Sequence, residues 1–167
     1  MNDSTNTIWP QQSKILTADE AQRTAEKLRK EGKVIGFTNG CFDLLHLGHM
    51  YSFVQARELC DVLFVGVNSD ASVKSYKGPN RPVHDEQTRS LLVAALPFVD
   101  YVVVFSERTA IPLVDKIHPE VTAKEGYTLE NWPEGQHVVD YGGRAVILKR
   151  LDGYSTTGFV KRMQCVE

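Results

Sequence analysis

The sequence predicts a single α/β domain: a Rossmann-like, doubly wound parallel sheet of five strands, with one helix preceding it. Three observations support this fold class. Short runs rich in Val, Ile and Phe alternate with segments of helical periodicity along most of the chain. The length of 167 residues suits one domain with a sizeable core. Polar residues gather directly after the apolar runs, where parallel sheets hold ligands.

The N-terminal region predicts a leader followed by a helix. Residues 1–14 are rich in Asn, Ser, Thr and Gln and show no periodicity, so we expect a disordered leader there and one folded domain over 15–167. The run Thr17-Ala18-Asp19-Glu20 has the form of a capping box, which predicts a helix beginning at Thr17. Gly32 is expected to end it.

The remaining elements follow from the alternation of patterns. Apolar runs predict the five strands, at Val34–Phe37, Val62–Val67, Tyr101–Phe105, Val121–Ala123 and Ala145–Leu148. Helical periodicity predicts helices at about residues 48–60, 85–96, 109–117 and 134–141, and from about residue 155 onward. The segment 72–82 contains Gly78, two prolines and three basic residues, and we expect it to be a mobile flap.

Composition excludes several classes of protein. The net charge of −2 gives no bulk attraction to nucleic acid or to an anionic membrane, and no apolar run is long enough to cross a bilayer. The three cysteines are far apart and include no CxxC pair, which argues against a disulfide framework and a zinc site. We therefore expect a cytoplasmic protein without a nucleic-acid or membrane partner.

The most informative segment runs from Thr38 to His49. It follows the first strand directly and predicts a tight turn and a helix start, an arrangement that presents backbone N–H groups and the positive end of a helix dipole to an anion. His46 and His49 are three residues apart, so both imidazoles face the same side of a helical turn. Gly48 between them is expected to let a ligand approach the backbone closely. Phosphate chemistry is the leading hypothesis.

Two further polar groups are expected at the same edge of the sheet. Asn68, Ser69, Asp70, Lys74 and Lys77 follow the second strand. The last strand is followed by a second potential anion site at a helix start, with Lys149, Arg150, Asp152, Ser155, Thr156 and Thr157. Two helix N-termini facing one cleft would suit a ligand with several phosphates. His46 and His49 would donate to the phosphates while Lys77 and Arg150 close over them.

Each candidate also has a plainer interpretation. A lone His46 would usually be a satisfied polar residue at a helix entrance, and Ser155 can be a simple N-cap. A metal-binding histidine pair is a third possibility, but the spacing differs from the i, i+4 zinc pair and no third ligand is evident. Lys74, Lys77 and Arg81 can belong to a solvated loop. Cys41 is expected to be a small residue of the turn or core.

These motifs resemble those of the HxGH nucleotidyltransferases, the cytidylyltransferase-like superfamily. The first signature is matched by residues 39–49 and the second by Ser155-Thr156-Thr157 after Arg150. Within the superfamily, residues 65–73, 77–82 and 99–103 are most similar to the D-glycero-β-D-manno-heptose 1-phosphate adenylyltransferase domain of ADP-heptose synthesis. The resemblance covers about residues 33–163.

The resemblance implies an enzyme that uses ATP and Mg2+, transfers a nucleoside monophosphate to a sugar phosphate and releases pyrophosphate. It implies that Mg2+ is held mainly through phosphates rather than by protein ligands, and it allows a homodimer. The implied catalytic residues are His46, His49, Lys77 and Arg150. The implied nucleotide- and phosphate-binding residues are Thr38, Asn39, Gly40, Cys41, Phe42, Asp43, Gly48, Asn68, Asp70, Arg89, Lys124, Ser155, Thr156 and Thr157.

The chain departs from that branch after the fourth predicted strand. Lys124-Glu125-Gly126-Tyr127 stands where the branch has Lys-Gly-Gly-Asp-Tyr, so Glu125 occupies a glycine position and the aspartate is missing. Two alternatives therefore stay open: a CTP-dependent cytidylyltransferase for glycerol 3-phosphate or a similar small phosphate, and a noncatalytic nucleotide sensor. A dinucleotide-binding oxidoreductase is disfavoured because no GxGxxG follows the first strand.

Overall fold

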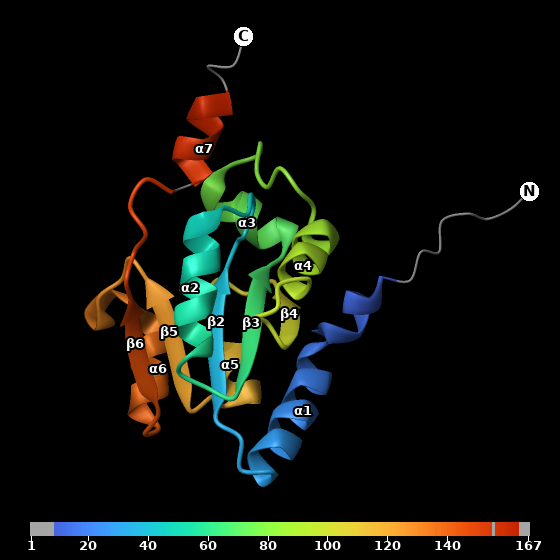
Figure 1. Cartoon of the computed structure of the whole chain (residues 1–167), viewed down its shortest axis with the longest axis vertical. Coiled ribbons are helices and arrows are strands. Elements are labelled where there is room, and N and C mark those ends of the chain that lie inside the picture. Colours follow the sequence, from blue (N-terminus) through green and yellow to red (C-terminus); the bar gives the residue numbers. More distant parts are fainter. Residues whose placement is uncertain (1–8, 155, 164–167) are drawn as a thin grey trace, which may run out of the picture.

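A computed structural model describes residues 9–154 and 156–163. Its core is a six-stranded, all-parallel sheet with the strand order β1-β4-β3-β2-β5-β6 (Figure 1). The strands are β1 (Ile15–Leu16), β2 (Ile35–Gly40), β3 (Val62–Asn68), β4 (Tyr101–Phe105), β5 (Val121–Glu125) and β6 (Arg144–Leu148). The α/β, Rossmann-like class is confirmed, but the prediction of five strands is wrong.

The missed strand is β1, which lies at one edge of the sheet. Ile15 pairs with Val102 and Leu16 with Val103 of β4. Two residues are too few to show the alternation that identifies a strand in a sequence. Part of the expected leader is also structured, because Pro10–Lys14 form a 3-10 helix, η1, and Lys14 Nζ donates to the carbonyl of Val99 at 2.8 Å.

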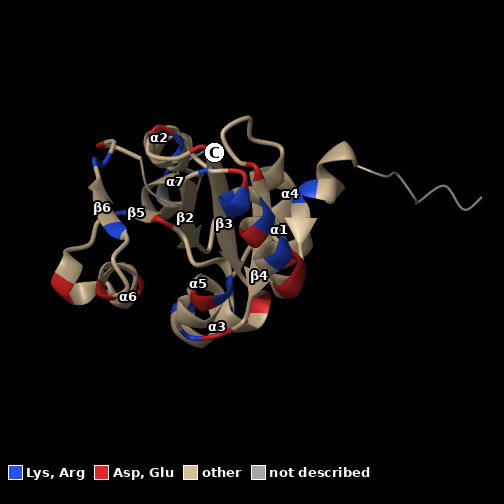
Figure 2. Cartoon of the chain, turned by 90° about the horizontal axis from the view of Figure 1, so that it is seen from below, with Lys and Arg blue, Asp and Glu red and all other residues tan. Residues whose placement is uncertain are grey.

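Helices cover both faces of the sheet, as a doubly wound fold requires. They are α1 (Ala18–Lys30), α2 (Leu47–Arg57), α3 (Asp70–Lys77), α4 (Glu86–Ala94), α5 (Ile111–Ile117), α6 (Pro133–Asp140) and α7 (Thr156–Met163), with a 3-10 turn η2 at Leu129–Asn131. One half of the core joins the sheet to α1, α5 and α6, and the other joins it to α2 and α4. Figure 2 shows α2 and α5 on opposite sides of the strands, with cationic and acidic residues interspersed along the helices.

The first helix forms as its sequence predicts. Thr17 is the N-cap of α1, its hydroxyl accepts from the backbone N–H of Glu20, and the Glu20 carboxylate accepts from the N–H of Thr17, so the capping box is confirmed. By contrast, α3 was not predicted. It occupies the first half of the expected flap and begins at the N-cap Ser69, whose hydroxyl accepts from the N–H of Ser72.

The topology fixes where a ligand can bind. From β2 the chain moves to β3 and then β4, and it returns to the other side of β2 to form β5 and β6. Strand order therefore reverses between β2 and β5, and the crevice at their carboxyl ends is the expected ligand site. Helix α7 lies beyond these strand ends (Figure 1). No helix in the described part of the chain is long and apolar enough to span a membrane.

Candidate active site

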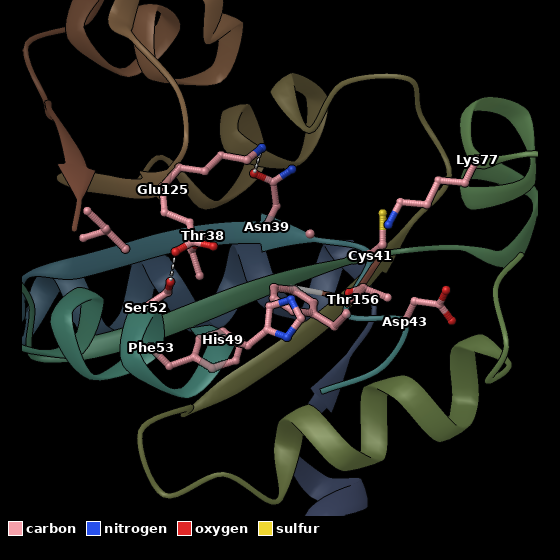
Figure 3. A pocket seen from close by; sticks show the side chains of 14 residues that line it. Thr38, Asn39, Cys41, Asp43, His49, Ser52, Phe53, Lys77, Glu125 and Thr156 are labelled. Atoms are coloured by element: carbon pink, nitrogen blue, oxygen red, sulfur yellow. Dashed lines mark hydrogen bonds between the residues drawn. The ribbon is translucent and has the colours of Figure 1, made fainter. Parts of the chain in front are cut away.

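Two adjoining pockets open at the carboxyl edge of the sheet. The smaller, which we call the histidine pocket, has a volume of about 170 Å³ and is lined by Thr38, Asn39, Gly40, Cys41, Phe42, Asp43, His49, Ser52, Phe53, Lys77, Lys124, Glu125, Leu148 and Thr156 (Figure 3). The larger, the arginine pocket, has a volume of about 490 Å³ and is lined by Asn39, Gly40, Cys41, Asn68, Tyr76, Lys77, Phe105, Arg108, Thr109, Lys124, Tyr127, Pro133 and Glu134. Residues 39–41, Lys77 and Lys124 belong to both.

The turn after β2 is held in an unusual backbone conformation. Phe42 has a φ of +47°, in the left-handed region that few side chains adopt. Its ring stacks edge-on against His49, with 5.4 Å between centroids, and it also packs on Phe53. A Cβ at Gly40 would lie 3.0 Å from that ring. Buried aromatic packing thus fixes the turn and aims His49 at the pocket.

The two histidines form a stacked pair at the start of α2. Their ring centroids are 3.8 Å apart and the planes differ by 23°. The backbone N–H of His46 donates to His49 Nδ1 at 3.4 Å, so the hydrogen of a neutral His49 ring is on Nε2. His46 Nδ1 is buried and has no hydrogen-bond partner among the described residues. The shared helical face predicted for these residues is therefore present.

Both imidazoles favour the neutral form. Burial lowers the pKa of His46, and the charge of Arg150 lowers it further against the opposing effect of Glu125. Burial, followed by the charges of His46 and Lys77, lowers the pKa of His49 to about 4. At neutral pH each ring therefore offers one N–H donor rather than a full positive charge.

We expect His49 to make folding stability depend on pH. Its folded-state pKa of about 4 lies below the 6.5 of an unperturbed imidazole, so the unfolded chain binds more protons between these values. The contribution is complete above pH 6.5 and is lost as the pH falls towards 4. Urea denaturation of the protein and of His49→Gln across this range measures the effect as a difference. Equal pH slopes for both would contradict it.

Gly48 lies against the ring of His46. A Cβ at this position would lie 2.9 Å from His46 Cε1, 3.0 Å from His46 Nδ1 and 3.4 Å from Tyr154 Cβ. The space that a side chain at this position would occupy is therefore filled by the imidazole, and the approach of a ligand to the Gly48 backbone stays a prediction. The glycine is needed to seat His46.

Asp43 is buried and fully engaged. Its carboxylate accepts from Arg81 at 2.7 Å and from the backbone N–H of Val83 at 2.6 Å. It therefore tethers the segment after α3 to the turn after β2.

Arg89 is wholly buried behind the turn and lines neither pocket. Its guanidinium donates to the carbonyls of His84 and Cys41, at 3.0 and 2.6 Å, and to the carboxylate of Asp70 at 2.7 Å. The backbone N–H of Asp70 in turn donates to Glu86. The structure therefore places Arg89 and Asp70 where they join three segments that carry the site.

Lys124 lies between the two pockets. Its ammonium donates to Asn39 Oδ1 at 3.2 Å and sits 4.6 Å from the centroid of the Tyr127 ring. Burial lowers its pKa, while the charge of Glu134 opposes that shift. Lys77, at the end of α3, is exposed and points at the same junction (Figure 3). These two cations therefore lie at the junction of the two pockets.

The other predicted residues are partly brought together. Asn68 is buried, lines the arginine pocket and donates to Ser72 Oγ. Cys41 Sγ lies 3.0 Å from the Tyr76 hydroxyl. Thr156, the first residue of α7, lines the histidine pocket, whereas Arg150 is exposed and lines neither pocket. Ser155 and the side chain of Thr157 lie outside the described residues.

Sequence reasoning missed about half of the residues that line the arginine pocket. Tyr76, Phe105, Arg108, Thr109, Pro133 and Glu134 come from separate elements, and only the folded sheet brings them together. Ser52 had a local signal, because it lies one helical turn after Gly48. No group of three or more His, Cys, Asp or Glu residues suited to a metal ion occurs among the described residues.

The comparisons with known proteins agree with this geometry. The chain is 45% identical to the bifunctional protein HldE of Syntrophotalea carbinolica over 152 residues, covering 90% of this chain and 31% of that one. It is 45% identical to HldE of Caulobacter vibrioides, covering 92% and 32%, and 50% identical to HldE of Rhodopseudomonas palustris, covering 81% and 28%. The chain thus spans about a third of the length of these relatives.

Solved structures and a family profile complete the comparison. The lipopolysaccharide core biosynthesis protein of Thermoplasma volcanium superposes with a TM-score of 0.63 at 25% identity, covering 72% of this chain and all of that one. Pantoate-beta-alanine ligase of Francisella tularensis shares the fold, with a TM-score of 0.56 at 13% identity over 92% of this chain and 79% of that one. The cytidylyltransferase-like profile matches residues 37–162, a range that contains both pockets. The chain belongs to the cytidylyltransferase-like family.

Proposed function

We propose that this chain is a nucleotidyltransferase that joins the nucleoside monophosphate of ATP to a sugar phosphate and releases pyrophosphate. One observation carries the proposal: the two pockets share a wall formed by residues 39–41, Lys77 and Lys124. In a displacement at the α-phosphorus, the acceptor oxygen enters on the side opposite to the departing pyrophosphate, so the nucleotide and the acceptor must bind side by side. Two pockets that meet at two cations supply that arrangement.

The histidine pocket suits the triphosphate. His49 presents a neutral donor to it, and the N-terminus of α7 faces it at Thr156. Lys77 adds an exposed positive charge. Such donors are worth most where negative charge develops, on the nonbridging oxygens of the α-phosphate and on departing pyrophosphate.

The arginine pocket suits the acceptor. It is the larger of the two, and it combines a cation at Arg108 with hydrogen-bonding groups at Asn68, Thr109 and Tyr127. A sugar phosphate would direct its phosphate towards Lys77 and Lys124 and its hydroxyl groups towards the remaining wall. The phosphate's second pKa is about 6, so the attacking oxygen is already ionised at pH 7 and needs no strong base.

The reaction then depends on positioning and on charge stabilisation. An acceptor phosphate oxygen forms a bond to the α-phosphorus, the α–β bridge breaks, and its electron pair leaves on pyrophosphate. Mg2+ fits as an ion held mainly through the phosphates. Asp43 is already bound to Arg81 and Val83, and Glu125 alone does not make a group of three ligands among the described residues. When bound, Mg2+ would neutralise phosphate charge.

For the acceptor we propose D-glycero-β-D-manno-heptose 1-phosphate, which would give ADP-heptose. The support is the similarity of residues 65–73 and 77–82 to the heptose branch and the match to about a third of each bifunctional relative, the size expected for one of two activities.

A screen of pyrophosphate release tests the function and the acceptor together. We expect release only with ATP, Mg2+ and heptose 1-phosphate among four nucleotides and a panel of sugar phosphates, with ADP-heptose identified by mass spectrometry. Dominant CDP-glycerol from CTP and glycerol 3-phosphate would overturn the acceptor and keep the chemistry. Nucleotide binding without any nucleotidyl product would overturn the enzyme and favour a sensor.

A further inference from the structure

Glu125 brings a carboxylate into a cavity otherwise equipped for anions. It is the last residue of β5 and pairs with Leu148 at the end of β6. On its other side β5 neighbours β2, which is followed by the turn that leads to His46 and His49. It lines the histidine pocket and not the arginine pocket, whereas Tyr127 on the same loop lines only the arginine pocket. Its side chain points towards Ser52 of α2 (Figure 3).

The Glu125 carboxylate retains capacity to accept hydrogen bonds. Ser52 Oγ donates to its Oε2 at 3.2 Å but shares its single hydrogen with the carbonyl of Gly48, also at 3.2 Å. Glu125 makes no ion pair within the described residues. The other acidic residue of this pocket, Asp43, is occupied by Arg81 and Val83. Glu125 is therefore the acid of this pocket that can receive a ligand's donors.

Charge decides which part of a ligand Glu125 can meet. A phosphate beside it would be repelled, so the triphosphate is expected to lie towards His49, Lys77 and Thr156. Neutral hydroxyl groups are the complementary partners, since the two oxygens of a carboxylate accept from two neighbouring O–H groups. The ribose of a nucleotide carries such a pair. A carboxylate at the carboxyl end of a parallel strand has this role in other nucleotide-binding sheets.

We propose that Glu125 accepts hydrogen bonds from the 2′- and 3′-hydroxyl groups of the nucleotide's ribose and makes this chain selective for ribonucleotides. Ser52 is the positioning residue that holds the carboxylate in place. The inference rests on the proposed function, because it requires the nucleotide in the histidine pocket and the acceptor in the arginine pocket.

The test compares binding of ATP and 2′,3′-dideoxy-ATP by titration calorimetry, with Mg2+ and without acceptor. We expect the wild-type chain to bind ATP about tenfold to a hundredfold more tightly, the effect of hydrogen bonds to a charged group. Glu125→Ala should bind both nucleotides with the affinity that the wild-type chain has for 2′,3′-dideoxy-ATP. Glu125→Gln keeps the shape without the charge and should lose most of the difference, which covers the case in which the alanine variant fails to fold.

Glu130→Gln is the matched control, because Glu130 is exposed in η2 and lines neither pocket. It should keep the full preference for ATP. Equal wild-type affinity for the two nucleotides, or an unchanged preference in Glu125→Gln and Glu125→Ala, would overturn the inference. So would a Glu125→Gln variant that keeps the preference but has a higher KM for the acceptor.

Pyrophosphate release by the same wild-type preparation separates the two proposals. If the chain releases pyrophosphate with an acceptor but binds ATP no more tightly than 2′,3′-dideoxy-ATP, only the proposed role of Glu125 is wrong. If the wild-type chain neither binds ATP nor releases pyrophosphate with any acceptor, the proposed function is wrong, and the role of Glu125 is wrong with it.

Discussion

His49→Ala should lower kcat by about a hundredfold to a thousandfold, the usual cost of removing one donor to developing transition-state charge. The imidazole lines the histidine pocket, and its Nδ1 is engaged by the backbone of His46, so Nε2–H is the donor it can offer to a phosphate. His46→Ala should also lower kcat by at least about a hundredfold, because the stacked ring supports His49 and borders the same helix start. Steady-state rates measure both effects.

His137→Ala is the control for these variants. His137 lies on α6, pairs with Asp115 and lines neither pocket, so its loss should leave kcat unchanged. Circular dichroism and thermal melting establish that each variant keeps the fold. A His49→Ala enzyme with near-normal kcat would limit this imidazole to packing against Phe42.

The clustering of the polar residues after β2 could be predicted because the segment is local in the sequence. Thr38, Asn39, Asp43, His46 and His49 lie on one strand, one turn and one helix start, so spacing alone brings them together. The close approach of the His46 ring to Gly48 could not be predicted, since the sequence does not reveal that the imidazole lies against the glycine. The conformation of the His46 side chain depends on its stacking against His49, which a sequence pattern does not contain.

Long-range features were the least predictable. The edge strand β1 forms because Ile15 and Leu16 pair with the otherwise unpaired edge of β4. This pairing depends on the path of the chain in space. Similarly, α3 has only Ser72 and Val73 buried, so it lacks the apolar stripe that marks a helix in a sequence. The arginine pocket combines the ends of β3 and β4 with the start of α6, regions that no local motif connects.

Arg89→Met should lower the free energy of unfolding by about 3 kcal/mol, the lower end of the cost of breaking a buried ion pair, because the Asp70 side chain stays 28% exposed. Arg89 is fully buried, and its guanidinium donates to His84, Cys41 and Asp70. Methionine fills similar space but leaves two carbonyls and the Asp70 carboxylate without this donor. Urea denaturation monitored by circular dichroism measures the loss.

Lys116→Met provides the matched comparison, because Lys116 forms its ion pair with Asp19 at the surface and should change stability little. The family resemblance places Arg89 near the triphosphate, and the two roles give opposite results. A residue that only binds phosphate would leave the urea midpoint unchanged when replaced and would weaken ATP binding. Replacing a residue that joins the turn after β2 to α3 and α4 lowers the urea midpoint even when no nucleotide is present, because the Cys41 carbonyl and the Asp70 carboxylate lose their partner.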